Sequence, residues 1–322
     1  MRMAKYVAKR VLLMLFVLFV ITTCCFMLVR MLPRSLPVAN AAQQAIIEAR
    51  WDALGYNQPL LVQYGIYLKN IFLHGDFGTS WYIKYMEPAW DLLVNRLLPT
   101  VMVNLYSLLF SVPLGIMLGI YAAIKKNRWQ DSLISTSVMV FVSVPSYVYA
   151  FLVQYFLYYQ LDWLPLNVYS LADAGGSWFT FKMFYSMLAP ILALSFGTIA
   201  GLARFTRAEL TETLTSDYML LARTKGLTRS QATSRHALKN AMVPILPSII
   251  SSFVGILGGS FIIEKIFSIP GVGNLYINSV FQRDYDVFMM DSIFYTLIGL
   301  LAGILVDISY GFIDPRIRMG EK

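Results

Sequence analysis

The sequence predicts an all-α integral membrane protein, and three observations support that prediction. The chain has 322 residues, of which 57% are hydrophobic and 14% charged, whereas a soluble domain is usually about one quarter charged. Six apolar runs reach or approach the length of about 20 residues that a helix needs to cross a bilayer. The basic residues lie mainly in the connections between these runs, as in other multi-pass membrane proteins.

The six runs differ in how well they define a span. The first follows a basic N-terminus and is too long for a secretory signal, so we expect it to remain in the membrane. The third contains Pro145, and the fourth is the shortest. Between the first and second runs, residues 32–98 mix aromatic and charged side chains and are expected to fold outside the bilayer. The runs cover residues 11–31, 100–124, 132–160, 187–203, 246–267 and 289–313.

The distribution of basic residues predicts the orientation. Six spans place both termini on one side, and that side holds 17 of the 26 Lys and Arg residues, seven of them in the 204–245 loop. Because positive charge accumulates in cytoplasmic connections, both termini and this loop are expected in the cytoplasm. The expected organisation is a cytoplasmic N-terminus with the first span (residues 1–31), an extracytoplasmic segment (32–98), a five-helix core (99–313) and a cytoplasmic tail (314–322).

Several kinds of chemistry find no support in the residues. The net charge of +8 follows the membrane pattern rather than a basic groove, which argues against nucleic-acid binding. Cys24 and Cys25 are adjacent in an apolar run, and His74 with Asp76 supplies too few ligands for a metal site. No Lys is followed by Ser or Thr, so a Walker-type phosphate loop is excluded.

Gly-x-x-x-Gly pairs occur four times inside the apolar runs. Glycines at this spacing share one helix face and allow a neighbouring backbone to approach closely. Static packing is the favoured interpretation, and sliding contacts in a moving bundle are the alternative. The pairs are Gly115/Gly119, Gly197/Gly201, Gly255/Gly259 and Gly299/Gly303.

The polar run 217–244, DYMLLARTKGLTRSQATSRHALKNAMVP, lies between two apolar segments. It predicts two short helices around Gly226, which is placed for the left-handed conformation that closes a helix. Ser216 or Asp217 is expected to cap the first helix. Thr228 and Gln231 have the spacing of a capping box at the second. That helix is expected to reach about Asn240, before Pro244.

This run is expected to be rigid and to present a mixed apolar and basic surface. The side chains expected on that surface are Tyr218, Met219, Leu221, Leu227, Arg223 and Lys225. Such a surface is suited to docking a soluble partner. An amphipathic pair lying on the lipid headgroups is the alternative, and local physics alone does not separate the two.

The run also resembles the cytoplasmic "EAA" loop of ABC importer permeases, whose short helix docks on the ATPase subunit. The general pattern, Glu-Ala-Ala, three residues and Gly, reads Leu220-Leu221-Ala222 before Gly226 here, so only the second Ala is kept. The peptide-permease branch matches at more positions. The matching positions are Asp217-Tyr218, Ala222-Arg223, Lys225-Gly226-Leu227, His236-Ala237-Leu238, Asn240-Ala241 and Pro244.

Three further segments resemble the same branch, and more narrowly its B-type subunit. They are LGYNQPLLVQYGIYLKNIFLHGDFGTS (54–80), EKIFSIPGVGNL (264–275) with RDY (283–285), and DISYGFIDPRIR (307–318). One departure is local: the B-type subunit usually carries Pro-Gly-Asp-Pro after its first span, where this chain has LPRSLP at 32–37.

The resemblance implies a six-helix type I importer permease fold with a coupling helix in the 204–245 loop, in the inner or plasma membrane of a prokaryote. It implies a second, C-type permease subunit, two ABC ATPase subunits and an extracytoplasmic peptide-binding protein as partners. This chain would bind no cofactor and catalyse no reaction, with ATP and Mg held by the ATPases. The transport mechanism would be alternating access.

The resemblance also assigns roles to residues of the loop. Those implied to dock on the ATPase and couple it are Tyr218, Met219, Leu221, Ala222, Arg223, Lys225, Gly226 and Leu227. Those implied to shape the loop are Asp217, Thr228, Gln231, His236, Asn240 and Pro244. His236 is expected to be a polar packing residue rather than a catalytic base, because no Ser, Cys or Asp constellation accompanies it.

Other functions remain open at this point. The same architecture could import nickel chelates or oligosaccharides, since sequence alone does not identify the residues that line the pathway. Asn104, Ser143, Ser195 and Ser252 are candidates for that lining and equally for helix–helix hydrogen bonds. A stand-alone secondary transporter should show repeated halves with broken helices. A membrane enzyme should show a catalytic pair, which Asp291 and Asp307 at opposite ends of one run do not supply.

Overall fold

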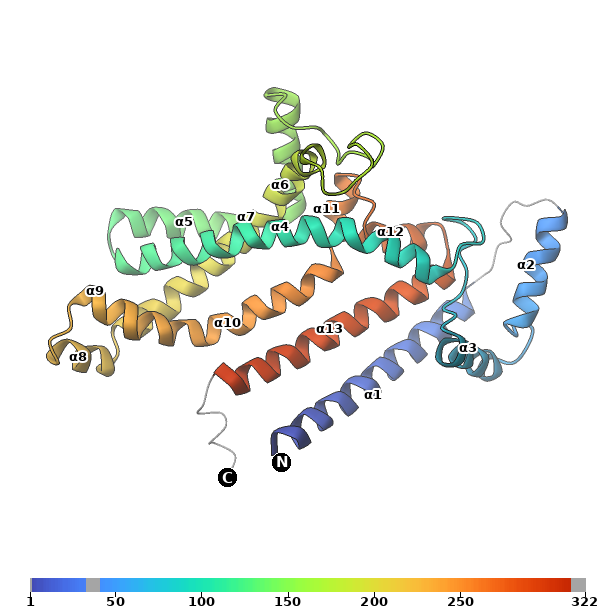
Figure 1. Cartoon of the computed structure of the whole chain (residues 1–322), viewed down its shortest axis with the longest axis horizontal. Helices are drawn as coiled ribbons and strands as arrows, with labels where there is room; N and C mark the ends of the chain where they lie inside the picture. The colour runs from blue at the N-terminus through green and yellow to red at the C-terminus, as the bar shows by residue number, and fades with distance from the viewer. Residues whose placement is uncertain (1, 33–40, 314–322) are drawn as a thin grey trace. The chain divides into compact units, whose positions relative to one another are not determined.

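The computed structural model describes residues 2–32 and 41–313. The expected cytoplasmic tail 314–322, most of the LPRSLP stretch and the end of DISYGFIDPRIR lie outside these residues. The described chain is helical, with one isolated bridge between Thr79 and Pro88. Figure 1 shows the order of the helices.

The helices of the first half are α1 (Arg2–Met31), α2 (Ala41–Ala53), α3 (Leu60–His74), α4 (Ala89–Ile124), α5 (Trp129–Ser143) and α6 (Ser146–Gln154), which continues as a π-helical turn Tyr155–Gln160. The second half contains α7 (Phe181–Leu214), α8 (Asp217–Thr224), α9 (Arg229–Ala232), a π-helical turn Thr233–Ala237, α10 (Leu238–Gly255) with a 3-10 turn Ile256–Gly258, α11 (Phe261–Ile266), α12 (Val272–Phe281) and α13 (Tyr285–Ile313).

The chain divides into two compact units. The first contains Met1–Leu98 and Pro270–Leu301, and the second contains Pro99–Ile269 and Ala302–Lys322. Helices α4 and α13 each contribute residues to both units.

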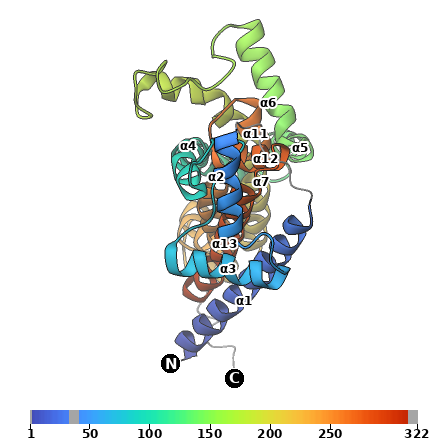
Figure 2. The same cartoon turned by 90° about the vertical axis from the view of Figure 1, so that its right-hand side faces the viewer.

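In the first unit, α1 packs against α3 (Figure 2), and aromatic side chains form the core between them. Phe26 lies 5.1 Å from the ring of Tyr64 and 5.0 Å from that of Tyr67, and all three are buried. The hydroxyl groups of Thr23 and Tyr64 are 2.6 Å apart. Aromatic pairs of this kind add to the stabilisation that burial provides. The end of α1 is therefore held by the segment that was expected to fold outside the bilayer.

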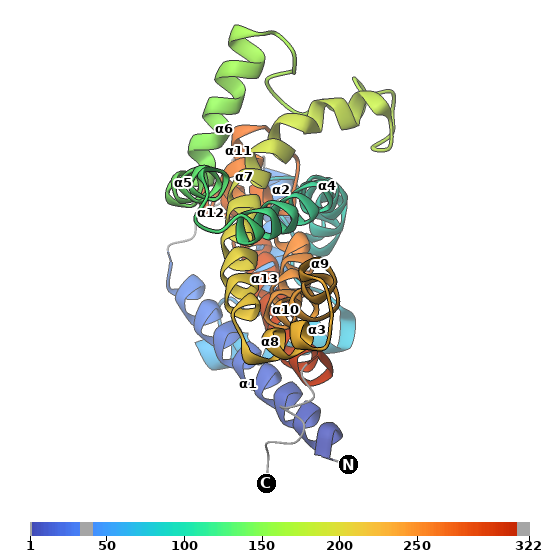
Figure 3. The ribbon, with the colours of Figure 1, turned by 90° about the vertical axis from the view of Figure 1, so that its left-hand side faces the viewer.

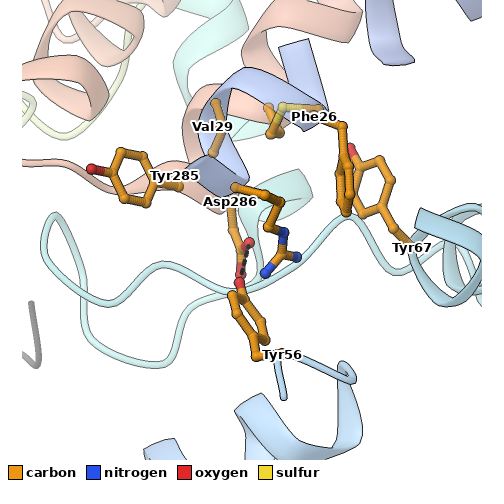
Figure 4. Close-up of a pocket in the computed structure, with 8 residues that line it drawn as sticks. Phe26, Val29, Tyr56, Tyr67, Tyr285 and Asp286 are labelled. Carbon is orange, nitrogen blue, oxygen red and sulfur yellow. Dashed lines mark hydrogen bonds between the residues drawn. The ribbon is translucent and has the colours of Figure 1, made fainter. Parts of the chain in front are cut away.

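A small pocket adjoins this core (Figure 4). The hydroxyl group of Tyr56 donates to Asp286 Oδ1 at 3.5 Å, and the guanidinium of Arg30 lies 3.6 Å from the centre of the Tyr56 ring. The backbone N–H of Thr79 donates to the other carboxylate oxygen of Asp286 at 3.2 Å. The end of α1, the connection before α3 and the start of α13 thus meet at one carboxylate.

Asp284, just before α13, fixes the loop that precedes α4. The side chain is fully buried, and it accepts a hydrogen bond from the Ser80 hydroxyl at 2.6 Å. It also accepts from the backbone N–H groups of Trp81, Tyr82 and Ile83 at 3.0–3.2 Å. A carboxylate with several backbone donors forms strong, charge-assisted hydrogen bonds. Residues 80–83 are therefore shaped around this single side chain.

The second unit is built around α7, which packs against α5, α6 and α10. Its core includes Met183, Met187 and Ala193 of α7 together with Ile263 and Phe267, all 0% exposed. The fourth expected span, residues 187–203, thus lies within a longer helix, Phe181–Leu214, which buries a row of apolar side chains in this core.

Within residues 2–32 and 41–313, five helices are long and apolar enough to span a membrane, and a sixth span exists if the bent pair α5–α6 counts as one. The third expected span, 132–160, is therefore not a straight helix: α5 and α6 meet at 99°. Val144 and Pro145 have extended ψ angles of 127° and 146°. A residue before proline is disfavoured in the helical region, which explains a break at this point.

The fifth span begins earlier than expected. Instead of residues 246–267, the candidate span covers Arg229–Gly258. The helix does not end near Asn240, and Pro244 and Pro247 both lie inside α10. Prolines are tolerated in membrane helices because neighbouring groups satisfy the freed backbone atoms. At Gly259, whose φ is 63°, the chain leaves the helical path before α11.

The four Gly-x-x-x-Gly pairs are not equivalent. A Cβ on Gly115 would lie 2.9 Å from Leu202 Cβ, and a Cβ on Gly119 would lie 2.6 Å from Thr206 Cβ. This pair therefore allows close packing of α4 on α7, as the static interpretation requires. Added Cβ atoms would meet nothing within 4 Å at Gly197, Gly201, Gly255, Gly299 and Gly303.

Candidate functional site

The first turns of the 217–244 run form a short helix with a defined end. Helix α8 covers Asp217–Thr224 and is followed by Gly226 at φ 88°. The N–H of Gly226 donates to Arg223 O at 3.0 Å, and the N–H of Leu227 donates to Ala222 O at 3.3 Å. These two bonds are those of a Schellman motif, in which a glycine adopts the left-handed conformation. The predicted role of Gly226 in ending the helix is confirmed.

The start of the next helix is also as the sequence predicts. Thr228 Oγ1 accepts from the N–H of Gln231 at 3.3 Å, and Gln231 Oε1 accepts from the N–H of Thr228 at 3.0 Å. This reciprocal pair is a capping box. The connection between α8 and α9 has only four residues, Lys225, Gly226, Leu227 and Thr228. The Schellman motif at the end of α8 and the capping box at the start of α9 therefore restrict the same short segment.

The cap predicted for α8 is not formed by a side chain. Ser216 occupies the N-cap position, but its hydroxyl donates to Thr213 O at 2.6 Å. Asp217 is the exposed first residue of the helix, where a negative charge is favourable to the helix dipole.

One face of α8 is buried in a core made within the loop. Met219 and Ala222 are only 4% and 7% exposed, and they pack with Leu210 of α7 and with Leu227. The expected exposure of Met219 is therefore wrong. The reason is spacing: residues three apart on a helix share a face, so Met219 and Ala222 turn inward together. Three alanines of the following helices, Ala232, Ala237 and Ala241, complete this core.

The opposite face of α8 is exposed, as shown by Tyr218 at 40%, Leu220 at 66% and Leu221 at 55%. Arg223 and Lys225 are exposed beside them. Figure 3 shows α8 next to α9 at the end of α10. Leu220 belongs to this surface, although the resemblance did not select it. In the sequence, the adjacent pair Leu220-Leu221 could have indicated this exposure. A two-turn helix that buries Met219 and Ala222 must leave the two residues between them exposed.

Two further loop residues differ from expectation. His236 was expected to pack within the loop, yet it is exposed, and so is Asn240. The inward positions are occupied by Ala237 and Ala241, one residue later. A π-helical turn at Thr233–Ala237 adds a residue to the helical repeat and so changes which side chains face the core.

The neighbouring connection between α4 and α5 is fixed by an ion pair. Asp131, whose side chain is 5% exposed, accepts from Arg207 Nε and Nη2 at 2.5 and 2.8 Å. It also accepts from the backbone N–H of Asn127 at 3.0 Å. A bidentate Arg–carboxylate pair gives geometric specificity as well as stability. Helix α7 thus holds the 125–131 connection in place.

The four candidate pathway residues make hydrogen bonds within the helical bundle. Ser195 is buried, and its hydroxyl is 3.1 Å from that of Ser107 on α4, so it forms a helix–helix contact. Asn104, Ser143 and Ser252 donate to carbonyl groups of their own helices at 2.8, 2.8 and 3.0 Å. Within the described residues, no three His, Cys, Asp or Glu side chains are grouped to hold a metal ion.

Comparisons with known proteins identify the family of this chain. Residues 115–319 match the family described as "Binding-protein-dependent transport system inner membrane component", and residues 3–103 match the N-terminal region of such membrane components.

Curated relatives cover nearly the whole chain. It is 35% identical to the dipeptide transport system permease protein DppB of Lactococcus lactis, over 98% of this chain and 100% of that protein. It is 34% identical to the glutathione transport system permease protein GsiC of Escherichia coli K12, over 98% and 99%. A crystal structure of an amino acid ABC transporter with histidines covers 69% of this chain and 94% of its own, at 19% identity and a TM-score of 0.49.

The family match covers more than half of the sequence, and the relatives exceed 30% identity over almost all of it. The resemblance to importer permeases that the 217–244 run carries is confirmed by these matches. The chain belongs to the binding-protein-dependent transport system inner membrane component family, and it is a membrane-spanning permease component of such a system.

Proposed function

We propose that this chain is the permease subunit of an ATP-driven peptide importer and forms half of its translocation pathway. The observation that supports peptides as the transported compounds is the full-length similarity to permeases named for dipeptide and for glutathione transport. Both named cargoes are small peptides, so the chemical class is shared even though the individual compounds differ.

The partners follow from the same family. They are a second permease subunit, two ABC ATPase subunits that hold ATP and Mg, and an extracytoplasmic peptide-binding protein. ATP hydrolysis belongs to the ATPases, and this chain itself is not an enzyme. Both termini lie in the cytoplasm, and so does the connection 215–228, which is what the candidate spans leave of the expected 204–245 loop; this is the side that the basic residues favour.

Helix α8 is the coupling element in this proposal. Its inner face, Met219 and Ala222, anchors it to the bundle, and its outer face, Tyr218, Leu221, Arg223 and Lys225, contacts the ATPase. The Schellman motif and the capping box restrict the connection behind it. When ATP closes the ATPase dimer, α8 moves with it and the bundle opens outward, and hydrolysis resets the bundle.

The test is purification of the tagged chain from its native membrane in mild detergent, with mass spectrometry of the proteins that accompany it. We expect a second permease and Walker-motif ATPases. After reconstitution with the binding protein, we expect ATP hydrolysis that rises with dipeptides or tripeptides. A chain that purifies alone, or a complex stimulated only by nickel chelates or oligosaccharides, would contradict the proposal.

A further inference from the structure

A groove of about 500 Å³ lies beside the coupling loop, within the second unit. It is formed by segments that are far apart in sequence: the end of α4, the following connection, the end of α7 and the helical segment that starts with α9. Its lining residues are Ile120, Ile124, Lys125, Arg128, Leu214, Arg229, Ser230, Thr233, Ser234 and Leu238.

The lining separates into two chemical zones. Ile120, Ile124, Leu214 and Leu238 make an apolar floor, and the rest of the lining is basic or carries hydroxyl groups, with no acidic residue. Lys125, Arg128 and Arg229 contribute three positive charges. Among the residues that the structure describes, none of the three has an ion-pair partner. The groove therefore offers uncompensated positive charge next to an apolar surface.

The two zones lie at the boundary of three candidate spans. Ile124 is the last residue of the span Ala89–Ile124, Leu214 is the last of Phe181–Leu214, and Arg229 is the first of Arg229–Gly258. Trp129, next to Arg128, is 71% exposed, and exposed tryptophans are enriched where a protein meets the headgroup layer. The apolar floor thus belongs to the ends of these helices, and the basic rim borders it, as basic residues do where membrane helices approach the headgroups.

We propose that this groove binds an anionic phospholipid of the leaflet that faces the coupling loop. An acyl chain lies along Ile120, Ile124 and Leu238, and the headgroup phosphate is bound by Lys125, Arg128 and Arg229. Basic pockets between membrane helices bind anionic headgroups in this way. A soluble anion would use only the rim, whereas a lipid uses both zones of the groove.

The bound lipid would also stabilise the coupling loop. Arg229 and Ser230 belong to α9, which packs against α8, while Lys125 and Arg128 belong to the connection held by Asp131. A headgroup that bridges the two sides restricts the movement of α9 relative to α4. This consequence rests on the proposed coupling role of α8, whereas lipid binding itself does not.

The test uses the intact complex in nanodiscs of phosphatidylcholine containing about one fifth phosphatidylglycerol, followed by native mass spectrometry of the lipid that remains bound in detergent. The groove variant is K125Q/R128Q/R229Q. The matched control, K126Q/R235Q/K239Q, removes three exposed charges of the same region that do not line the groove. A second variant, S230E, adds one negative charge at an exposed position of the rim.

We expect wild type and the control to retain phosphatidylglycerol in preference to phosphatidylcholine. The groove variant should retain at least about tenfold less, because it removes three positive charges that attract an anionic headgroup. S230E should also lose the lipid. Because retention of lipid is measured apart from ATPase and transport, a complex without peptide-stimulated hydrolysis can still confirm the site.

Three results would overturn the proposal. Equal loss of lipid in the groove variant and the control would indicate general surface electrostatics instead of a site. Displacement of the lipid by millimolar inorganic phosphate would indicate a site for soluble anions. Efficient cross-linking of Ser234→Cys to the ATPase in a complex without bound lipid would assign the groove to that protein.

Discussion

Arg207 of α7 holds Asp131 of α5 through two hydrogen bonds, at 2.5 and 2.8 Å, and the two partners are not equally buried. The Asp131 side chain is 5% exposed, whereas that of Arg207 is 32% exposed. Removing one partner of a buried pair leaves the other charge without compensation, and the cost depends on how far water can reach that charge. The two single substitutions, one at each partner, should therefore destabilise the protein by different amounts.

We expect Arg207→Ala to destabilise the complex by about 3–5 kcal/mol, because it leaves a buried carboxylate unpaired. Asp131→Ala should reduce the stability less, since the remaining guanidinium can turn toward water. The double variant should be less damaging than the sum of the two. Thermal unfolding followed by fluorescence-detected size exclusion would measure all three. Equal losses for the two single variants would contradict this asymmetry.

The close packing of α4 on α7 gives the second prediction. A Cβ at Gly119 would lie 2.6 Å from Thr206 Cβ and 2.7 Å from Ala203 O. Gly119→Ala should destabilise the bundle by about 1–3 kcal/mol, as expected for overpacking against backbone. Gly201→Ala is the control, because its Cβ meets nothing within 4 Å. The melting temperature in detergent should fall for Gly119→Ala alone, and a similar fall in both variants would argue against this contact.

The sequence predicts local features of this protein better than features that depend on tertiary contacts. Gly226 and the Thr228/Gln231 capping box follow from a few neighbouring residues, and both are confirmed. Met219 was assigned to the wrong face because α8 has apolar residues on both sides, and only contact with Leu210 decides which side is buried. Burial depends on that distant partner, which local periodicity does not contain.

The same limit explains the other differences. Pro145 marks a break, but the sequence does not give the 99° angle between α5 and α6, which depends on how each packs against α7. Four glycine pairs share one spacing, yet Gly115/Gly119 is the one pair in which a Cβ added to either glycine would meet another helix. The groove proposed to bind lipid brings together residues from 120 to 238, so no single motif could have indicated it.

Asp284 gives the third prediction, which concerns residues 80–83. Asp284→Ala removes the acceptor for the Ser80 hydroxyl and for three backbone N–H groups. A buried donor left without a partner costs about 1–3 kcal/mol, so this loop should open. Amide hydrogen exchange of a peptide covering 79–88 should become at least about tenfold faster, the effect of about 1.4 kcal/mol. Exposed Asp162→Asn is the control, and unchanged exchange in Asp284→Ala would show that other contacts shape the loop.

The exposed charges of α8 give the fourth prediction. Arg223→Glu with Lys225→Glu should weaken retention of the ATPase in pull-down experiments, because both side chains lie on the proposed docking face. Reversal of charge in an interface mainly reduces association and its salt tolerance. Arg235→Glu with Lys239→Glu makes the same change at exposed positions outside that face. If both double variants retain the ATPase equally, α8 is not the contact.

The last prediction concerns Gly226, where the backbone alone sets the requirement. Its φ is 88°, and an added Cβ would meet nothing within 4 Å, so a substitution there is strained without any steric clash. A non-glycine residue in the left-handed region costs about 1–2 kcal/mol, and Asn tolerates it better than Ala or Val. We expect Gly226→Val to leave the complex in the membrane. In proteoliposomes, this variant should transport less peptide for each ATP that is hydrolysed.

The substitutions at Gly226 should follow a fixed order, because only backbone strain distinguishes them. Coupling, measured as peptide transported per ATP hydrolysed, should decrease from Gly through Asn and Ala to Val. Gly65→Ala is the matched control: its Cβ also meets open space, but its backbone is helical, so coupling should stay at the wild-type value. Wild-type coupling in Gly226→Val would show that the Schellman motif does not position α8. An equal loss in Asn and Val variants would mean that a property of glycine other than its left-handed backbone is required there.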